Sequence, residues 1–135
     1  MVSVFIVLLI LQFQNVIISA SIGATAFIIF AMPENITAGS RRVIGGYCIG
    51  ALCGSLCALI PQPFDIITLL VYAFAVGLSI FLMVVFDMEH PPASGIALGM
   101  AISGFSWKVI IATMSASIML SIIHTVFKKY IRDLV

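Results

Sequence analysis

Residues 87–100 read DMEHPPASGIALGM and interrupt a chain that is otherwise almost wholly apolar. The first six positions hold two acids, a histidine and two adjacent prolines. Because Pro91 disfavours helical geometry at the residue before it, one helix should end at or before Glu89 or His90. Pro92 suits the first position of a helix, where its missing N–H needs no partner. We therefore predict two separate helices, one on each side of His90.

The composition is that of an integral membrane protein. The chain has 135 residues, of which 63% are hydrophobic and 8% charged, and its mean hydropathy is +1.31. That leaves too few polar side chains to cover a water-soluble globule. The apolar runs are long enough for helices and lack the alternation of a membrane barrel, so the predicted fold class is all-α. A net charge of +1 does not indicate the basic surface that binds nucleic acid, so no nucleic-acid partner is expected. The expected partner is the lipid bilayer.

Polar and helix-breaking residues divide the chain into six apolar segments, at about residues 1–15, 16–32, 43–60, 65–86, 91–105 and 107–127. The first lacks the basic start of a signal peptide, so we interpret it as a membrane span. The second and fifth are short, and each begins with small residues, SASIGATA and HPPASGIA. We predict a polytopic membrane protein with four long transmembrane helices and two short broken or half helices.

The order of one long, one short and one long segment occurs twice. Placing Gly23 on Gly95 also aligns Ser21 with Ala93. A duplicated three-segment unit is the usual construction of small transporters. We predict one transmembrane domain over residues 1–135, with repeat 1 at about 1–60 and repeat 2 at about 65–130.

The basic residues test how the short segments run. If all six segments cross the membrane, Lys108 stands alone on one side and the other basic residues share the opposite side: Arg41, Arg42, Lys128, Lys129 and Arg132. If the short segments are re-entrant, three basic residues fall on each side. The positive-inside rule favours full crossing, with both termini cytoplasmic in the plasma (inner) membrane. Three crossings per repeat would make the two repeats inverted.

The start of the fifth segment is a candidate anion site. A helix beginning at Pro92 would leave the N–H groups of the next residues at its end, which carries about half a positive charge. The matching residues 19–23 could begin a second half helix, capped by a serine. Two such ends meeting would bind a small anion between them. The candidate substrate-binding residues are Ser19, Ser21, Gly23, Thr25, His90, Pro91, Pro92, Ala93, Ser94 and Gly95. The alternative is that the prolines and His90 only end a helix at the membrane surface.

The same residues carry a family resemblance. HPPASG at residues 90–95, after a Met-rich apolar helix, resembles the signature of the HPP family of integral membrane proteins. SIGATA at 21–26, followed by Phe30, Pro33 and RVIGG at 42–46, is similar to a second block of that family. The resemblance covers nearly the whole chain and implies nitrite transport. The chain departs from the family where Gly39 and Ser40 replace Gln-Pro and where Tyr47 replaces a common histidine.

A protonated His90 beside an anion would strengthen anion binding, so transport should rise as pH falls through the histidine pKa. Asp87 and Glu89, if close to the ring, would favour the protonated form and move that rise to higher pH.

Small residues recur at every fourth position in two segments, at Gly46, Gly50 and Gly54 and at Gly95, Gly99 and Ser103. This pattern predicts close helix packing, although one stripe could instead line a narrow pathway.

The sequence contains no pattern for catalysis, a cofactor or a metal. Cys48, Cys53 and Cys57 form no CxxC pair and are interpreted as packing residues. A haem protein would need facing histidines, and His90 with His124 has neither helical spacing nor a second motif. We interpret His124 as an interfacial residue, and Arg41 and Arg42 as topology determinants.

We therefore expect no enzyme, but a transporter or channel subunit for a small monovalent anion, first of all nitrite, that associates with copies of itself. The alternative is a structural or assembly membrane subunit without transport activity.

Overall fold

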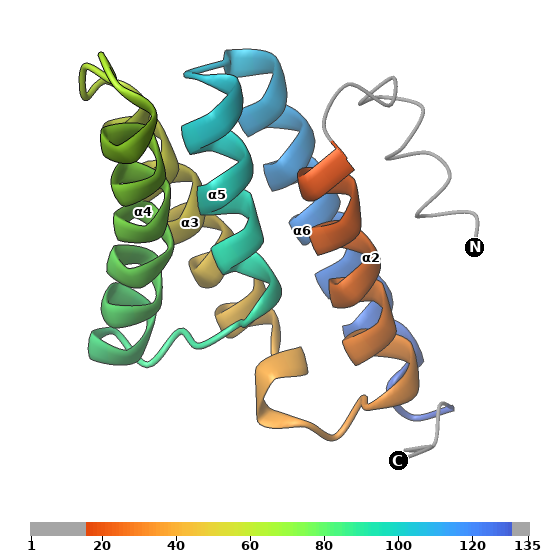
Figure 1. Cartoon of the computed structure of the whole chain (residues 1–135). Helices are drawn as coiled ribbons and strands as arrows, with labels where there is room; N and C mark the ends of the chain where they lie inside the picture. The colour runs from red at the N-terminus through yellow and green to blue at the C-terminus, as the bar shows by residue number, and fades with distance from the viewer. Residues whose placement is uncertain (1–15, 131–135) are drawn as a thin grey trace.

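The computed structural model describes residues 16–130, which form five α-helices and one short 3-10 helix (Figure 1). The elements are α2 (Val16–Ala31), η1 (Ile36–Ala38), α3 (Ser40–Ala58), α4 (Asp65–Val85), α5 (Pro92–Ser103) and α6 (Trp107–Phe127). No strand occurs between residues 16 and 130, so the predicted all-α class is confirmed for the part described. The predicted first span, at residues 1–15, lies outside it.

Helix lengths separate long helices from short ones. α4 and α6 have 21 residues each, or about 31 Å of helix, and within residues 16–130 they alone are both long and apolar enough to cross a membrane. α3 has 19 residues but carries two arginines and several glycines and serines. α5 has 12 residues, about 18 Å, and falls short of a hydrocarbon core of about 30 Å, whereas α2 has 16 described residues and begins at Val16, the first residue that the structure describes.

The short helix α5 lies at the centre of the bundle. Figure 1 shows α4, α5 and α2 side by side, with α3 and α6 behind them, and α5 contacts α2, α3 and α4. Gly95 of α5 lies against Ser21 of α2, and Gly99 lies against Ile18, so the two short helices run antiparallel. α3 runs parallel to α5, because Gly46 lies against His90 and Gly54 against Ala97.

The glycine stripes are packing surfaces, as predicted. A Cβ built on Gly46 would lie 2.8 Å from the Cβ of His90, and one on Gly54 would lie 2.6 Å from the Cβ of Met100. A Cβ on Gly50 would collide with the carbonyl oxygen of Ala93. Backbone approach this close requires residues without side chains. The stripe on α3 therefore sets the position of α5 and of the loop that carries His90.

The predicted start of the second helix at residues 19–21 is wrong. Both Ser19 and Ser21 lie inside α2, which is helical from Val16 onward. Small residues alone do not force a helix to end, and the Ser21 hydroxyl donates back to the carbonyl of Ile17 at 2.9 Å, as serines inside helices do. Because α2 and α5 are antiparallel, the two helix N-termini lie at opposite ends of the bundle and do not meet. The predicted break before α5 is confirmed, since residues 88–91 are not helical.

The basic residues gather at one end of the bundle, which we call the charged end. The Ser40 hydroxyl, at the start of α3, lies 3.4 Å from the Ser121 carbonyl oxygen and 3.2 Å from the Thr125 hydroxyl, near the end of α6. Arg41 and Arg42 therefore share this end with Lys128 and Lys129, which follow α6 directly. Lys108 lies at the opposite end of α6. Arg132 lies outside the described residues.

Candidate functional site

His90 is the centre of a buried polar cluster near the charged end. The residue lies in the loop between α4 and α5, and it is 0% exposed. Its Nε2 atom lies 2.8 Å from Thr25 Oγ1 on α2, and its Nδ1 atom lies 2.8 Å from the Thr37 carbonyl oxygen in η1. Thr25 Oγ1 also lies 2.9 Å from the Tyr47 hydroxyl on α3. We refer to His90, Thr25, Tyr47 and the Thr37 carbonyl as the His90 cluster.

The hydrogen bonds of the His90 cluster specify a tautomer. The Thr37 carbonyl can only accept, so Nδ1 of His90 carries the hydrogen. In the neutral ring Nε2 is then an acceptor, and the Thr25 hydroxyl donates to it. The Tyr47 hydroxyl in turn donates to Thr25 Oγ1. Thus the neutral cluster leaves no ring nitrogen without a partner.

Burial lowers the pKa of His90, although the hydrogen bond to the Thr37 carbonyl acts in the opposite direction. Asp87 and Glu89 were expected to raise this pKa only if they lay close to the ring. Both carboxylates are paired with Arg42 instead, and neither forms a hydrogen bond with the ring.

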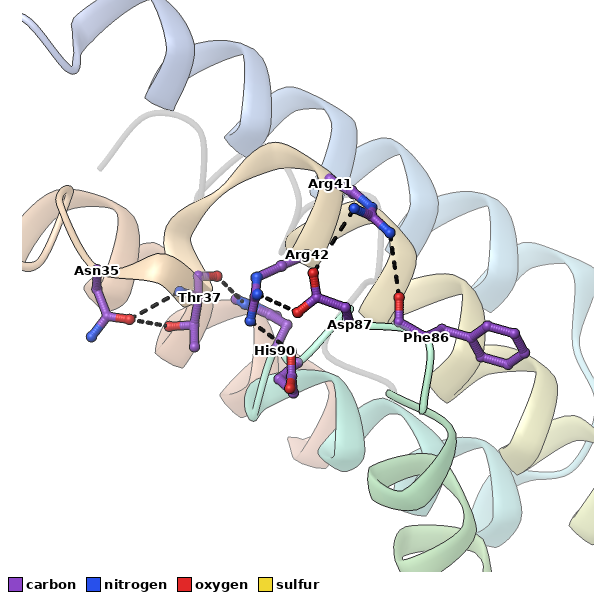
Figure 2. A network of polar contacts seen from close by, with 8 residues as sticks. Asn35, Thr37, Arg41, Arg42, Phe86, Asp87 and His90 are labelled. Atoms are coloured by element: carbon purple, nitrogen blue, oxygen red, sulfur yellow. Dashed lines mark hydrogen bonds and ion pairs between the residues drawn. The ribbon is translucent and has the colours of Figure 1, made fainter. Parts of the chain in front are cut away.

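An ion-pair network secures the loop just before His90 (Figure 2). Arg42 Nη1 donates to Glu89 Oε2 at 2.6 Å, and Arg42 Nη2 donates to Asp87 Oδ1 at 2.5 Å. Arg41 Nη1 lies 3.9 Å from Asp87 Oδ2. Arg42 therefore holds the α4–α5 loop in place, in addition to any role in membrane topology.

Asp87 also ends α4 by its backbone. Its φ of 54° is in the left-handed region, and the Met88 N–H donates to the Met83 carbonyl at 2.8 Å. This is the hydrogen bond of a Schellman cap, in which glycine is the common residue at the left-handed position. The ion pairs of Asp87 thus accompany a sharp turn that directs the chain toward His90.

The start of α5 differs from the expected open anion site. The Ala93 N–H donates to the His90 carbonyl at 2.9 Å, and the Ser94 N–H donates to the Pro91 carbonyl at 3.1 Å. The expectation that these two groups stand free is therefore wrong, because the loop turns back and supplies its own acceptors. The Ser94 hydroxyl also donates to the Pro91 carbonyl, at 2.8 Å.

A cavity lies beside this loop, between it and α4. Its volume is about 170 Å³. The residues around it are Ile80, Met83, Val84, Glu89, His90, Pro91 and Ser94, and the surface that they present to it is almost entirely apolar. Since one water occupies about 30 Å³ of liquid, the cavity has room for a small polyatomic anion.

The predicted site residues are only partly brought together. His90 and Thr25 share a hydrogen bond, and Gly95 packs against Ser21. Ser19 lies in α2, and its buried hydroxyl has no hydrogen-bond partner among the described residues. The other predicted positions, Gly23 on α2 and Pro91, Pro92, Ala93 and Ser94 at the start of α5, do not contribute side-chain groups to the His90 cluster. Their substrate-binding roles stay predictions.

Sequence reasoning did not find two members of the cluster. Tyr47 carries a signal, since it stands where the family commonly has a histidine, but the sequence does not identify its partner. The Thr37 carbonyl carried none, because a backbone acceptor has no side-chain signature. The interfacial interpretation of His124 stays a prediction; the structure adds that the residue is buried and that its Nε2 donates to the Pro33 carbonyl at 2.9 Å.

Comparison with known families adds an independent result. The family model described as the HPP transmembrane region matches residues 1–133. The chain belongs to the HPP family. No curated protein and no solved structure matches it. In this HPP membrane region, His90 and Pro91 lie in the break between α4 and α5, Pro92 begins α5, and the buried imidazole lies against α2 and α3.

The lowered pKa of His90 predicts how stability depends on pH. In the unfolded chain His90 binds a proton near the ordinary histidine pKa of about 6.5. In the folded chain its pKa is lower, so just below about pH 6.5 the unfolded state holds more protons than the folded state. The contribution of His90 to the free energy of unfolding is therefore fully present above about pH 6.5. As pH falls, the free energy of unfolding decreases by up to about 1.4 kcal/mol per pH unit, until the folded protein also binds the proton. Denaturant unfolding in detergent between about pH 8 and pH 5 measures this slope. The His90→Gln variant should have a shallower slope, and equal slopes would contradict the prediction.

Proposed function

We propose that this HPP membrane region is a transporter or channel subunit that moves a small monovalent anion, with nitrite the first candidate, beside the His90 cluster. The observation that carries the proposal is a titratable histidine, 0% exposed and bonded to a buried threonine, inside a bundle of apolar helices. Ionisable side chains inside membrane proteins are costly and mark ion pathways. Membership of the HPP family supports a membrane function of this kind.

The cavity beside His90 supports a location for the anion. His90, Pro91, Ser94 and Glu89 are among the residues that line it, and the Glu89 carboxylate is paired with Arg42. That ion pair reduces the repulsion that a free carboxylate would exert on an anion. We therefore propose the cavity between the α4–α5 loop and α4 as the location of the anion.

The helix directions support the inverted repeat that many transporters use. α2 and α5, which hold the same place in the two proposed repeats, are antiparallel. α3 and α6 are antiparallel too, because the start of α3 lies against the end of α6. We propose repeats at about 1–60 and 65–130, both termini on the cytoplasmic side of the plasma (inner) membrane, and association with further copies of the chain.

One observation favours a second candidate, a structural or assembly subunit without transport activity. Both ring nitrogens of His90 form hydrogen bonds, one with Thr25 and one with the Thr37 carbonyl. These hydrogen bonds join the α4–α5 loop to α2 and η1. A buried network with every group satisfied can serve to specify packing alone.

Anion flux in liposomes distinguishes the two candidates. We expect the purified chain to pass nitrite faster than nitrate, formate or chloride, and at least roughly tenfold faster than protein-free liposomes, a difference of about 1.4 kcal/mol in barrier. Circular dichroism on the same samples verifies that the protein is helical. Folded protein with no flux of any of the four anions would contradict the transport proposal and favour the structural subunit.

A further inference from the structure

Thr25 has more hydrogen-bond partners than its single proton can serve. Its Oγ1 atom lies 2.8 Å from His90 Nε2, 2.9 Å from the Tyr47 hydroxyl and 3.0 Å from the Ser21 carbonyl oxygen. The Ser21 carbonyl can only accept, and Nε2 also accepts while the ring is neutral. The hydroxyl can therefore donate to one of them at a time, and the other is left without this proton.

We propose that Nε2 of His90 is a proton-binding site that takes up a proton together with the transported anion, and that the Thr25 hydroxyl turns to accommodate it. This inference rests on the proposed anion transport and names its coupling ion.

The cluster can satisfy both protonation states without moving a heavy atom. In the neutral state Nδ1–H donates to the Thr37 carbonyl, and Thr25 donates to Nε2. When a proton from water binds the Nε2 lone pair, Nε2–H donates to Thr25 Oγ1, and the Thr25 O–H turns to the Ser21 carbonyl. Tyr47 donates to Thr25 Oγ1 in both states. Release of the proton to water reverses the same rotation, so atoms and charge balance over the cycle.

The surroundings explain why an anion would accompany the proton. Tyr47 of α3 is tilted beside the imidazole, with ring centroids 5.8 Å apart. The charged groups nearest in the loop, Asp87 and Glu89, are paired with Arg42. α2 and α5 contain no titratable side chain.

The remaining neighbouring groups do not supply a counter-charge either. Glu34, before η1, is exposed, α4 has its single acid, Asp65, at the far end, and His124 of α6 binds the Pro33 carbonyl. Within residues 16–130, an imidazolium at position 90 thus has no carboxylate of its own, and a buried charge without a partner is costly. An anion in the cavity lined by His90, Pro91 and Ser94 would offset it, so the two ions should move together.

Nitrogen-15 NMR of the histidines in lipid bilayers tests the proton site directly. The chain has 2 histidines, so a His124→Gln background isolates the signal of His90. At high pH we expect His90 to be protonated at Nδ1 and unprotonated at Nε2. As pH falls, Nε2 should gain a proton. Thr25→Val should lower the midpoint by about one pH unit, because a charge-assisted hydrogen bond is stronger than a neutral one. Thr25→Ser keeps the hydroxyl and should leave the midpoint nearly unchanged. Bare Nδ1 in the neutral ring, or a Thr25→Val midpoint equal to that of wild type, would overturn the proposed site.

Proton movement in liposomes tests the coupling. An inward nitrite gradient should acidify the lumen by one proton per anion, after subtraction of protein-free liposomes, which report passive entry of the undissociated acid. Anion flux without protein-dependent acidification would overturn this inference alone. Folded protein with no anion flux would overturn both the proposed function and the joint uptake of proton and anion. The NMR result would still show whether Nε2 of His90 binds a proton.

Discussion

Replacing His90 by glutamine should lower anion flux by roughly ten- to a hundredfold while the protein stays folded. The wild-type imidazole can become charged, and a charge-assisted hydrogen bond contributes about 1.5–3 kcal/mol. A glutamine side chain can accept a hydrogen bond from Thr25, as Nε2 does, or donate one to the Thr37 carbonyl, as Nδ1 does. Its amide cannot bind a proton in this pH range. The variant should also lose the rise of flux at low pH that we expect of the wild type.

The chain offers a matched control for this substitution. His124 is also buried and also donates from a ring nitrogen to a carbonyl, that of Pro33, at 2.9 Å. His124→Gln removes a histidine of the same kind from outside the His90 cluster, so its flux and pH dependence should remain close to wild type. A folded His90→Gln protein with wild-type flux and pH dependence would show that His90 serves only to join the helices.

The second large effect is expected from a single methyl group between α3 and α5. Gly50→Ala should decrease the free energy of unfolding by roughly 1–3 kcal/mol, because overpacking a tight contact forces the backbone to shift. The Cβ atom would meet the carbonyl oxygen of Ala93, which belongs to the backbone of α5 and cannot rotate away. Denaturant unfolding in detergent measures the loss. We also expect reduced flux, since α3 carries Tyr47 and α5 follows directly on His90.

Gly77→Ala is the control for helix propensity. Gly77 lies in α4, and a Cβ built there would have no described atom within 4 Å. This substitution should increase the free energy of unfolding by about 0.5–1 kcal/mol, because alanine favours the helix over glycine. If Gly50→Ala were as stable as Gly77→Ala, the tight α3–α5 contact described above would be wrong.

Much of the architecture followed from residues with strong local preferences. The apolar composition predicted a helical membrane protein, and Pro91 with Pro92 predicted the break between α4 and α5 that the structure contains. The spacing of Gly46, Gly50 and Gly54 predicted a packing stripe, because a glycine row permits backbone contact whatever the partner is. The small residues at the start of the second segment do not begin a helix, since serine and glycine favour a cap only where the chain actually turns.

The sequence by itself thus determined the membrane class, the proline break and the helix faces that pack closely, because each depends on chemistry within a few residues. Only the tertiary structure decided what His90 contacts. Its partner Thr25 is 65 positions away in the chain, and Arg42 is 45 and 47 positions away from the carboxylates that were expected to act on the histidine. Such pairings depend on how α2, α3 and the α4–α5 loop meet in space, and no local preference of the residues encodes that meeting. For that reason the sequence could indicate that His90 matters, but the direction of its pKa shift and the identity of its hydrogen-bond partners came from the fold.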